Sequence, residues 1–299
     1  MQKEYKVSVI VNCFNGEKYL ERCLKSIIDQ TIDNWEVIFL DNKSSDSSKK
    51  IFKSFNDQRF KYFCSPYFMK LYEARNEALK YANGDFIAFL DCDDWWEIFH
   101  LKNAEFFFNN QKFSFYFSNA YNYYEKKKVF KLHKKSLPKK NIFENLVDDY
   151  SVKISSLIIR KKILDLYDNQ VFNKKFNIIG DYDLVMKIAS KHESCSSDVP
   201  SVNCSFHGEN YSLKNRDEYV EEFNYWFKNI NFKNENFFKK KKMITDNIIY
   251  INQFREITKQ KKVKNLIEIF KIKNLKKKIK LIFLFFIPKF LINKLLSRY

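Results

Sequence analysis

The stretch from Phe86 to Trp96, FIAFLDCDDWW, constrains the fold more than any other part of the chain. Its first five residues are apolar and include no glycine or proline, which predicts a short strand buried on both faces. Asp91, Asp93 and Asp94 follow at the carboxyl end of this strand, where ligands collect in an open α/β sheet. Unpaired carboxylates are costly to bury, so we expect a cationic group to face them.

Two interpretations of this acidic segment are open from the residues alone. Alternate carboxylates after a strand can share one hard cation and leave its other positions to water and phosphate oxygens. The alternative is a solvated acidic turn or a helix N-cap. A bare Asp-x-Asp motif is more often one of these than a metal site.

Strand and helix patterns alternate around this stretch. Strands are expected at 5–12, 35–40, 60–65, 86–90, 113–118, 153–160 and 199–206, and helices at 17–30, 47–55, 71–82, 98–110, 181–191 and from 217 onward. The basic segment 124–140 is expected to form a loop or hairpin. The alternation predicts an α/β fold with a mainly parallel sheet, right-handed crossovers and flanking helices.

Length and cysteine content restrict the class of protein. A chain of 299 residues can bury a substantial core. The six cysteines form no Cys-x-x-Cys pair, and the first residues lead into a strand without a signal-peptide core. We therefore expect reduced thiols and a cytoplasmic chain.

The basic charge is concentrated at the C-terminus. The net charge is +18, and the segment from Lys233 onward contains 19 Lys and Arg against four Asp and Glu. Its uninterrupted apolar run, 281–287, is too short to span a bilayer. Basic residues beside a Phe/Leu/Ile face favour a helix in the interface of an anionic membrane leaflet. The alternative is a C-terminal helix docked on the preceding part of the chain with solvated lysines.

Several motifs in the first 100 residues occur in a characteristic order. They are VIVNCFN at 9–15, Tyr19-Leu20 with Ser26-Ile27 and Gln30-Thr31, LDNKSSD at 40–46, EARN at 73–76 and LDCDD at 90–94. Together they resemble the family 2 glycosyltransferases with the GT-A fold. The chain has Asn12 where that family usually has Pro or Thr, and Asn42 where many members have Asp.

The resemblance assigns roles to the acidic segment. It implies an Mn²⁺ or Mg²⁺ ion between the carboxylates and the diphosphate of a nucleotide-sugar donor. Asp93 is expected to coordinate the metal directly. Asp91 is expected to contribute through water or the donor ribose, and Asp94 to support the other two carboxylates.

Further donor contacts follow from the same resemblance. Phe14 is expected to stack on the nucleotide base, and Asp41 and Asn42 to hydrogen-bond to the base or ribose. Arg75 is expected to reach the nucleotide or diphosphate with its fork of donors. The alternative for Arg75 is a surface helix residue paired with Glu73 or Glu77.

The segment IIGDYDL at 178–184 resembles the part of the family that contains the catalytic carboxylate, with Gly180 in place of the usual leading Glu. Asp181 then matches the base that takes the proton of the acceptor hydroxyl in an inverting transfer. The alternative for Asp181 is a helix N-cap. Asp183 is expected to hold the acceptor or to orient Asp181.

Three further residues have both a functional and a plainer interpretation. His207, in a His-x-x-Asn-x-Ser segment similar to one in the family, is expected to contact metal or diphosphate. The rival is a zinc site made of His192-x-x-Cys195 and Cys204-x-x-His207. Trp95 is a candidate platform for the acceptor sugar, whereas Trp95 and Trp96 more often pack in a core or loop.

The resemblance implies an inverting glycosyltransferase of hexosyl or N-acetylhexosaminyl type, acting on a lipopolysaccharide, lipooligosaccharide or capsule-type acceptor at the inner face of the membrane. A catalytic domain is expected at 1–215, with a nucleotide-sugar half at 1–120 and an acceptor half at 121–215, followed by a basic helical region at 216–299. No nucleic-acid partner is expected. The alternatives are a non-catalytic protein that binds membrane or nucleic acid through the basic region, and an inactive relative that serves as a scaffold.

Overall fold

A computed structural model describes residues 5–139, 142–168, 170–230 and 235–296, with the backbone alone for 235–243 and 293–296. The chain divides into two compact units, described separately below. The first comprises Met1–Ile142 and Ser151–Ser205, and the second comprises Phe143–Tyr150 and Phe206–Tyr299.

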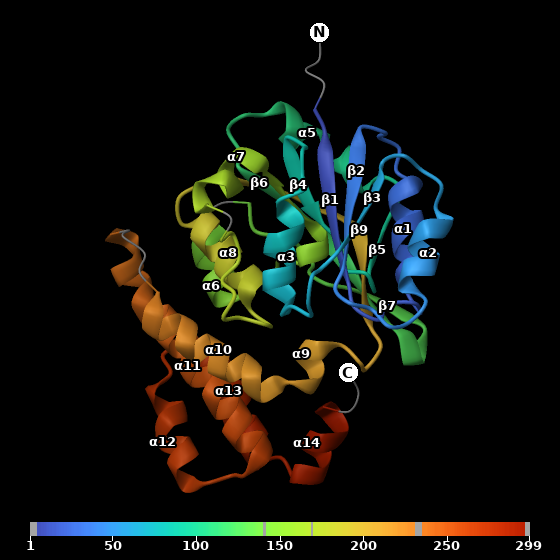
Figure 1. The fold of residues 1–299 in the computed structure, drawn as a ribbon. Helices are drawn as coiled ribbons and strands as arrows, with labels where there is room; N and C mark the ends of the chain where they lie inside the picture. The colour runs from blue at the N-terminus through green and yellow to red at the C-terminus, as the bar shows by residue number, and fades with distance from the viewer. Residues whose placement is uncertain (1–4, 140–141, 169, 231–234, 297–299) are drawn as a thin grey trace. The chain divides into compact units, whose positions relative to one another are not determined.

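The described part of the first unit is built on a nine-stranded sheet with the order β3-β2-β1-β4-β8-β6-β9-β5, with β7 paired to β6 (Figure 1). The strands are β1 Val7–Cys13, β2 Trp35–Asp41, β3 Phe60–Cys64, β4 Phe86–Phe89, β5 Trp95–Trp96, β6 Phe115–Tyr124, β7 Val129–Leu132, β8 Leu157–Arg160 and β9 Ser194–Phe206. Strands β1 to β4 pair in parallel, whereas β8 runs antiparallel to β4 and β6. The predicted α/β architecture is confirmed, and its parallel part is the part that precedes the acidic segment.

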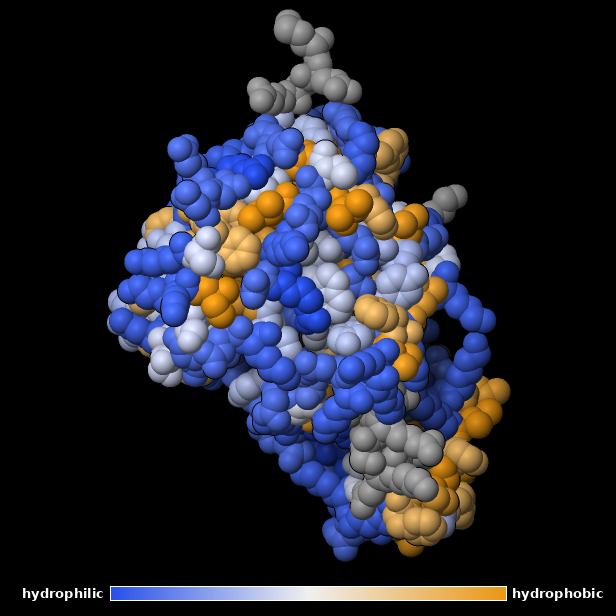
Figure 2. Space-filling view, turned by 90° about the vertical axis from the view of Figure 1, so that its right-hand side faces the viewer, coloured by the Kyte–Doolittle hydropathy of each residue, from blue (hydrophilic) through white to orange (hydrophobic). Residues whose placement is uncertain are grey.

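Short helices connect these strands. They are α1 Leu20–Ile28, α2 Ser48–Ser54, α3 Leu71–Leu79, α4 His100–Asn103, α5 Glu105–Asn109, α7 Lys161–Leu164 and α8 Gly180–Ala189, with 3-10 turns η1 Glu125–Lys127, η2 Ile154–Ser156 and η3 Asp165–Tyr167. The apolar face predicted for the first helix is buried at Leu20, Cys23, Leu24 and Ile27. Figure 2 shows the side of the molecule that carries α1 and α2, where small hydrophobic patches interrupt a mostly hydrophilic surface.

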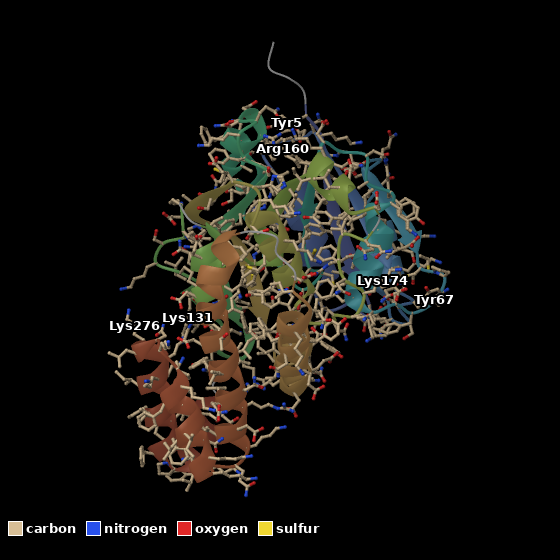
Figure 3. The ribbon with its side chains drawn as sticks, turned by 90° about the vertical axis from the view of Figure 1, so that its left-hand side faces the viewer. Tyr5, Tyr67, Lys131, Arg160, Lys174 and Lys276 are labelled. Carbon is tan, nitrogen blue, oxygen red and sulfur yellow. The ribbon has the colours of Figure 1, made fainter. Side chains whose placement is uncertain are left out.

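Two sequence predictions differ from the structure. The helix predicted at 98–110 is two helices that meet at Ala104, and Arg160 (labelled in Figure 3) stabilises the end of the second one. Its guanidinium donates hydrogen bonds to the carbonyls of Phe107 and Asn110, each at 2.8 Å. The strand predicted at 153–160 begins as η2, because the Ser156 hydroxyl bonds back to the Lys153 carbonyl at 2.8 Å and favours a tight turn. The hairpin predicted within 124–140 is confirmed by the pairing of β6 with β7.

A buried carboxylate holds the start of the parallel sheet together. Glu36 in β2 is 1% exposed and accepts hydrogen bonds from Lys6 at 2.8 Å, Lys61 at 2.6 Å, the Ser8 hydroxyl at 2.7 Å and the Asn83 amide at 2.9 Å. Burial by itself raises the pKa of Glu36, but these four donors outweigh it and lower the pKa to about 2.

We expect Glu36 to make folding sensitive to acid. A pKa lower in the folded than in the unfolded chain gives stability that is complete above about pH 4.5 and is lost as the pH falls toward 2. At pH 7, Glu36→Gln should therefore lower the free energy of unfolding by about 3 kcal/mol, as a shift of this size implies. Urea unfolding of both proteins between pH 3 and 7 measures the difference, with the exposed Asp33→Asn as control. A difference that stays constant across this range would contradict the assignment.

The described helices of the second unit form a small bundle with its own core. They are α6 Ile142–Asp148, α9 Tyr211–Lys214, α10 Arg216–Asn229, α11 Glu235–Lys259, α12 Val263–Lys271, α13 Leu275–Phe286 and α14 Lys289–Leu296. Ile257, Ile269, Ile272 and Leu281 are buried together, whereas Phe283, Phe286 and Phe290 are exposed. Among the described residues, none of the helices combines the length and the apolar character that crossing a membrane requires.

Candidate active site

The acidic segment forms a tight turn at the carboxyl end of β4. The Leu90 amide donates to the Ile10 carbonyl of β1 at 3.0 Å, and the Asp94 amide donates back to the Asp91 carbonyl at 2.9 Å. One carboxylate oxygen from each of Asp91, Asp93 and Asp94 lies within 4.8 Å of the others. Oxygen donors gathered at this spacing suit a hard divalent cation, so the residues fit the Mn²⁺ or Mg²⁺ that the sequence implies.

Asp94 braces the turn. It is buried, and its two oxygens accept hydrogen bonds from the Ser155 hydroxyl at 2.6 Å and the Ser205 amide at 2.8 Å. Burial and then the neighbouring charges of Asp93 and Asp91 raise the pKa of Asp94 well above its ordinary value. A divalent cation would relieve this repulsion. Because both Asp94 oxygens are engaged, Asp91 and Asp93 are the better candidates for metal ligands.

Arg75 on α3 supplies the cationic partner expected for these carboxylates. Its guanidinium is buried and forms an ion pair with the Asp91 carboxylate. The alternative of a surface arginine paired with Glu73 or Glu77 is wrong. Burial and the charge of Asp93 raise the pKa of Asp91, and Arg75 partly offsets that rise.

The same helix reaches the second acidic motif. Tyr72 lies one helical turn before Arg75, and its hydroxyl is 3.1 Å from Asp181 Oδ1 and 2.9 Å from the Ile178 carbonyl oxygen. Burial raises the pKa of Asp181, and Arg75 partly offsets this rise too. One face of α3 therefore joins Asp91 to Asp181, although the two are far apart in the chain.

Asp181 lies in the first turn of α8, whose N-cap position is Ile179, so the N-cap alternative for Asp181 is wrong. The absence of a side chain at Gly180 is required, because a Cβ there would lie 2.5 Å from the ring of Tyr72. This close approach explains why glycine stands where the family usually has glutamate. Asp183, farther along α8, is buried and pairs with Lys187 at 2.6 Å.

Phe14 follows β1 on an exposed loop. Its side chain is 49% exposed, and its ring centroid lies 4.7 Å from that of Phe68. The loop is fixed by Asn15, which has a positive φ of 51° and accepts a hydrogen bond from the Ser45 amide at 2.8 Å. Phe14 and Phe68 thus form an exposed aromatic pair against which a planar base could pack. No motif in the sequence indicated Phe68.

Asp41 and Asn42, the other predicted donor contacts, are buried and make internal hydrogen bonds. Asp41 accepts from the Ser44 amide at 2.8 Å and the Tyr62 hydroxyl at 2.6 Å. The Asn42 side chain donates to the Met69 carbonyl at 2.8 Å and accepts from the Met69 amide at 2.9 Å. Asn42 thus positions the loop that presents Phe68.

The two tryptophans have different surroundings. Trp96 is buried and donates from Nε1 to the Ser155 carbonyl at 2.7 Å, as expected for core packing. Trp95 is partly exposed, and the guanidinium of Arg22 lies 3.7 Å from its ring centroid. Arg22 also donates to the Asp93 carbonyl at 3.1 Å. No motif in the sequence indicated that Arg22 would support the acidic turn.

His207 belongs to the second unit, where its amide donates to Asn210 Oδ1 at 3.0 Å. Within the described ranges, the cluster of His, Cys, Asp and Glu side chains arranged to hold a metal is Asp91, Asp93 and Asp94. The zinc alternative, in which His207 would be one ligand, therefore has no support.

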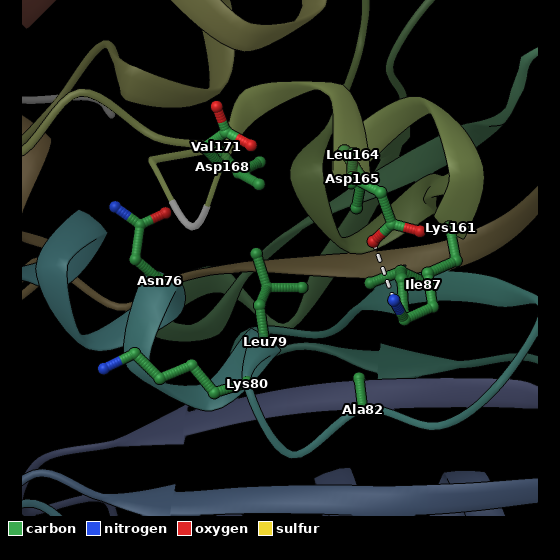
Figure 4. A pocket seen from close by; sticks show the side chains of 10 residues that line it. All are labelled: Asn76, Leu79, Lys80, Ala82, Ile87, Lys161, Leu164, Asp165, Asp168 and Val171. Carbon is green, nitrogen blue, oxygen red and sulfur yellow. Dashed lines mark hydrogen bonds and ion pairs between the residues drawn. The ribbon is translucent and has the colours of Figure 1, made fainter.

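A separate hollow of about 250 Å³ lies between α3 and α7 (Figure 4). An ion pair between Lys161 and Asp165 at 2.7 Å lies at its edge. Its lining includes none of the candidate site residues, so we assign no part of the reaction to it.

Known proteins resemble this chain in sequence and in fold. The model of the family described as Glycosyl transferase family 2 matches residues 8–172. An Escherichia coli relative, UDP-Glc:alpha-D-GlcNAc-diphosphoundecaprenol beta-1,3-glucosyltransferase WfgD, is 28% identical over 210 residues, which are 70% of this chain and 78% of WfgD. The alignment with a second E. coli glucosyltransferase, WfaP, covers 46% of that protein.

Among solved structures, residues 1–349 of S. aureus TarS in complex with UDP-GlcNAc superpose with a TM-score of 0.69 at 19% identity, over 89% of this chain and 81% of that one. This likeness confirms the GT-A fold. The chain belongs to glycosyl transferase family 2, and it is a glycosyltransferase.

Proposed function

We propose that this glycosyltransferase moves a hexose or N-acetylhexosamine from a nucleoside-diphosphate donor to a hydroxyl of a surface glycan or glycolipid, with inversion at the sugar carbon and with a divalent metal. The observation that supports this proposal best is the bridge from Asp91 through Arg75 and Tyr72 to Asp181. It connects an acidic turn whose carboxylates could hold a divalent cation to a carboxylate of raised pKa that could act as the base, and both groups suit such a transfer.

The proposed roles follow from the contacts. Asp93 and Asp91 would hold the ion, which when bound would neutralise the diphosphate and stabilise the leaving group. Phe14 and Phe68 would contact the base. Asp181 would take the proton of the acceptor hydroxyl. At the same time the hydroxyl oxygen would bond to the sugar carbon and the sugar–phosphate bond would break. The raised pKa of Asp181 makes its carboxylate a stronger base than an ordinary aspartate.

The acceptor we propose is a lipid-linked glycan at the inner face of the cell membrane. The name of WfgD describes a diphosphoundecaprenol acceptor. The second unit exposes Phe283, Phe286 and Phe290 on helices rich in lysine, which suits peripheral contact with an anionic membrane.

A donor screen tests the enzymatic proposal. The full chain would be incubated with nucleoside-diphosphate sugars and a detergent-dispersed polyprenyl-diphosphate saccharide, with and without Mn²⁺ or Mg²⁺. We expect release of nucleoside diphosphate with at least one sugar, only when metal is present and faster when acceptor is added. Release that is equally fast in a metal chelator would contradict metal dependence. Metal-dependent release that acceptor does not accelerate would contradict the acceptor class.

The exposed phenylalanines of the second unit give a separate prediction. Phe283→Ser with Phe286→Ser should weaken co-sedimentation with phosphatidylglycerol vesicles by about tenfold or more, because each buried aromatic side chain contributes about 1.5–3 kcal/mol. The matched control is Phe106→Ser with Leu166→Ser, two exposed apolar residues of the first unit. Equal binding by both double variants would exclude this face as the membrane contact. Strong binding to an oligonucleotide instead of vesicles would favour the nucleic-acid alternative.

A further inference from the structure

The hairpin formed by β6 and β7 carries a dense cluster of lysines. Residues 126–135 include six lysines and no acidic residue. Lys126, Lys127 and Lys128 are exposed at the turn, and Lys131, labelled in Figure 3, is exposed on β7. This charge lies in the first unit and is distinct in sequence from the basic C-terminal segment. The proposed chemistry does not use it.

Apolar side chains are exposed beside these lysines. Val129, Phe130 and Leu132 are 41%, 50% and 47% exposed. Phe130 pairs with Tyr123 and Leu132 with Tyr121 in the antiparallel register, so these four residues share one face of the hairpin. The rings of Phe130 and Tyr123 lie 4.6 Å apart, which gives that face a continuous apolar surface.

The hairpin is held in place. Glu125, at its turn, accepts a hydrogen bond from the Tyr19 hydroxyl at 3.0 Å and pairs with Lys18 at 3.2 Å. Trp95 packs against Tyr123 with ring centroids 5.4 Å apart. The exposed apolar residues are therefore presented by a fixed element, and little further ordering is needed for them to bind a surface.

We propose that the β6–β7 hairpin docks on an anionic lipid surface, with Phe130 and Leu132 entering the interface and the lysines of the turn, Lys126, Lys127 and Lys128, facing the lipid phosphates. Opposite charge and exposed apolar area together are the two signals that stable membrane attachment requires. A saccharide would account for the aromatic rings but not for the lysines. A nucleic acid would account for the lysines but not for Val129 and Leu132. The proposal does not depend on the identity of donor or acceptor.

Insertion of the hairpin can be located by tryptophan fluorescence in the full chain. Phe130→Trp would be mixed with vesicles of brominated phosphatidylcholine containing about 30% phosphatidylglycerol, an anionic surface of the kind that attracts lysines. We expect the fluorescence gained over the unmodified protein to be quenched severalfold more than that gained by Phe106→Trp, an exposed position elsewhere in the first unit. Equal quenching at the two positions would overturn the proposal, even if the C-terminal helices bind the vesicles.

Charge reversal provides a second test. Lys126→Glu, Lys127→Glu and Lys128→Glu together should weaken binding to the same vesicles by at least about tenfold, given the attraction expected for each lysine near an anionic surface. The control reverses Lys49, Lys50 and Lys53, three exposed lysines of α2, and so changes the net charge equally. Equal loss in both triple variants, or loss of heparin binding without loss of vesicle binding, would overturn the proposal.

Discussion

Asp181→Asn is expected to lower the turnover of sugar transfer by about 10³-fold while leaving donor binding intact. General-base catalysis contributes about 10²–10⁴ in rate, and an amide of the same shape cannot accept the proton of the acceptor hydroxyl. The variant keeps an oxygen 3.1 Å from the Tyr72 hydroxyl, so the junction between α3 and α8 should be preserved. Initial rates of nucleoside-diphosphate release, with calorimetric titration of donor in parallel, separate kcat from binding.

The pH profile gives this prediction an independent readout. Asp181 acts as a base only when it is ionised, and burial raises its pKa. Activity should therefore rise with pH on an acidic limb that lies above the range of an ordinary aspartate, and this limb should be missing from the residual activity of Asp181→Asn. Asp165→Asn, a change at an exposed carboxylate paired with Lys161, serves as the matched control. If Asp181→Asn transferred sugar at the rate of the unmodified protein, another residue would have to be the base.

Hydrophobic periodicity was enough to predict most of the strands and helices of the first unit. The strand signals are strong because β1, β2 and β4 are buried on both faces, and buried strands must be continuously apolar. The pattern fails where backbone conformation depends on distant partners. The turn η2, for example, places Ser155 against Asp94, and neither residue indicates the other in the sequence.

The candidate site was predictable as a set of motifs but not as an arrangement. The acidic turn and the GDYD segment are each visible in the chain. Arg75 belongs to the EARN motif, but the motif predicts a donor contact and does not indicate the ion pair with Asp91, and no pattern indicates that Tyr72 reaches Asp181. Gly180 looked like a departure from the family, yet the ring of Tyr72 occupies the space a side chain would need. Asn42 is a predicted donor contact, and the sequence does not indicate that its side chain also bonds to the backbone of Met69. Such relations depend on tertiary contacts, which no local pattern encodes.

Asp93→Ala is expected to abolish metal-dependent binding of the donor and to reduce transfer by about 10²–10³-fold, the typical cost of losing an electrostatic contact to a developing charge. The contacts that are known to brace the turn are made by its neighbours. Asp91 is paired with Arg75, and both Asp94 oxygens accept hydrogen bonds from the protein. Removing Asp93 should therefore weaken the cation site without removing the contacts that brace the turn.

Asp94→Ala provides the informative contrast. It removes both acceptor oxygens and leaves the buried Ser155 hydroxyl and the Ser205 amide without this partner, so the substitution should lower the melting temperature as well as activity. Asp93→Ala should leave the melting temperature close to that of the unmodified protein while eliminating the effect of Mn²⁺ on donor binding in calorimetry. Donor binding by Asp93→Ala that Mn²⁺ still strengthens to the normal extent would show that the cation is held elsewhere. In that case the acidic turn would contribute to the fold through its contacts with the protein and would not bind metal.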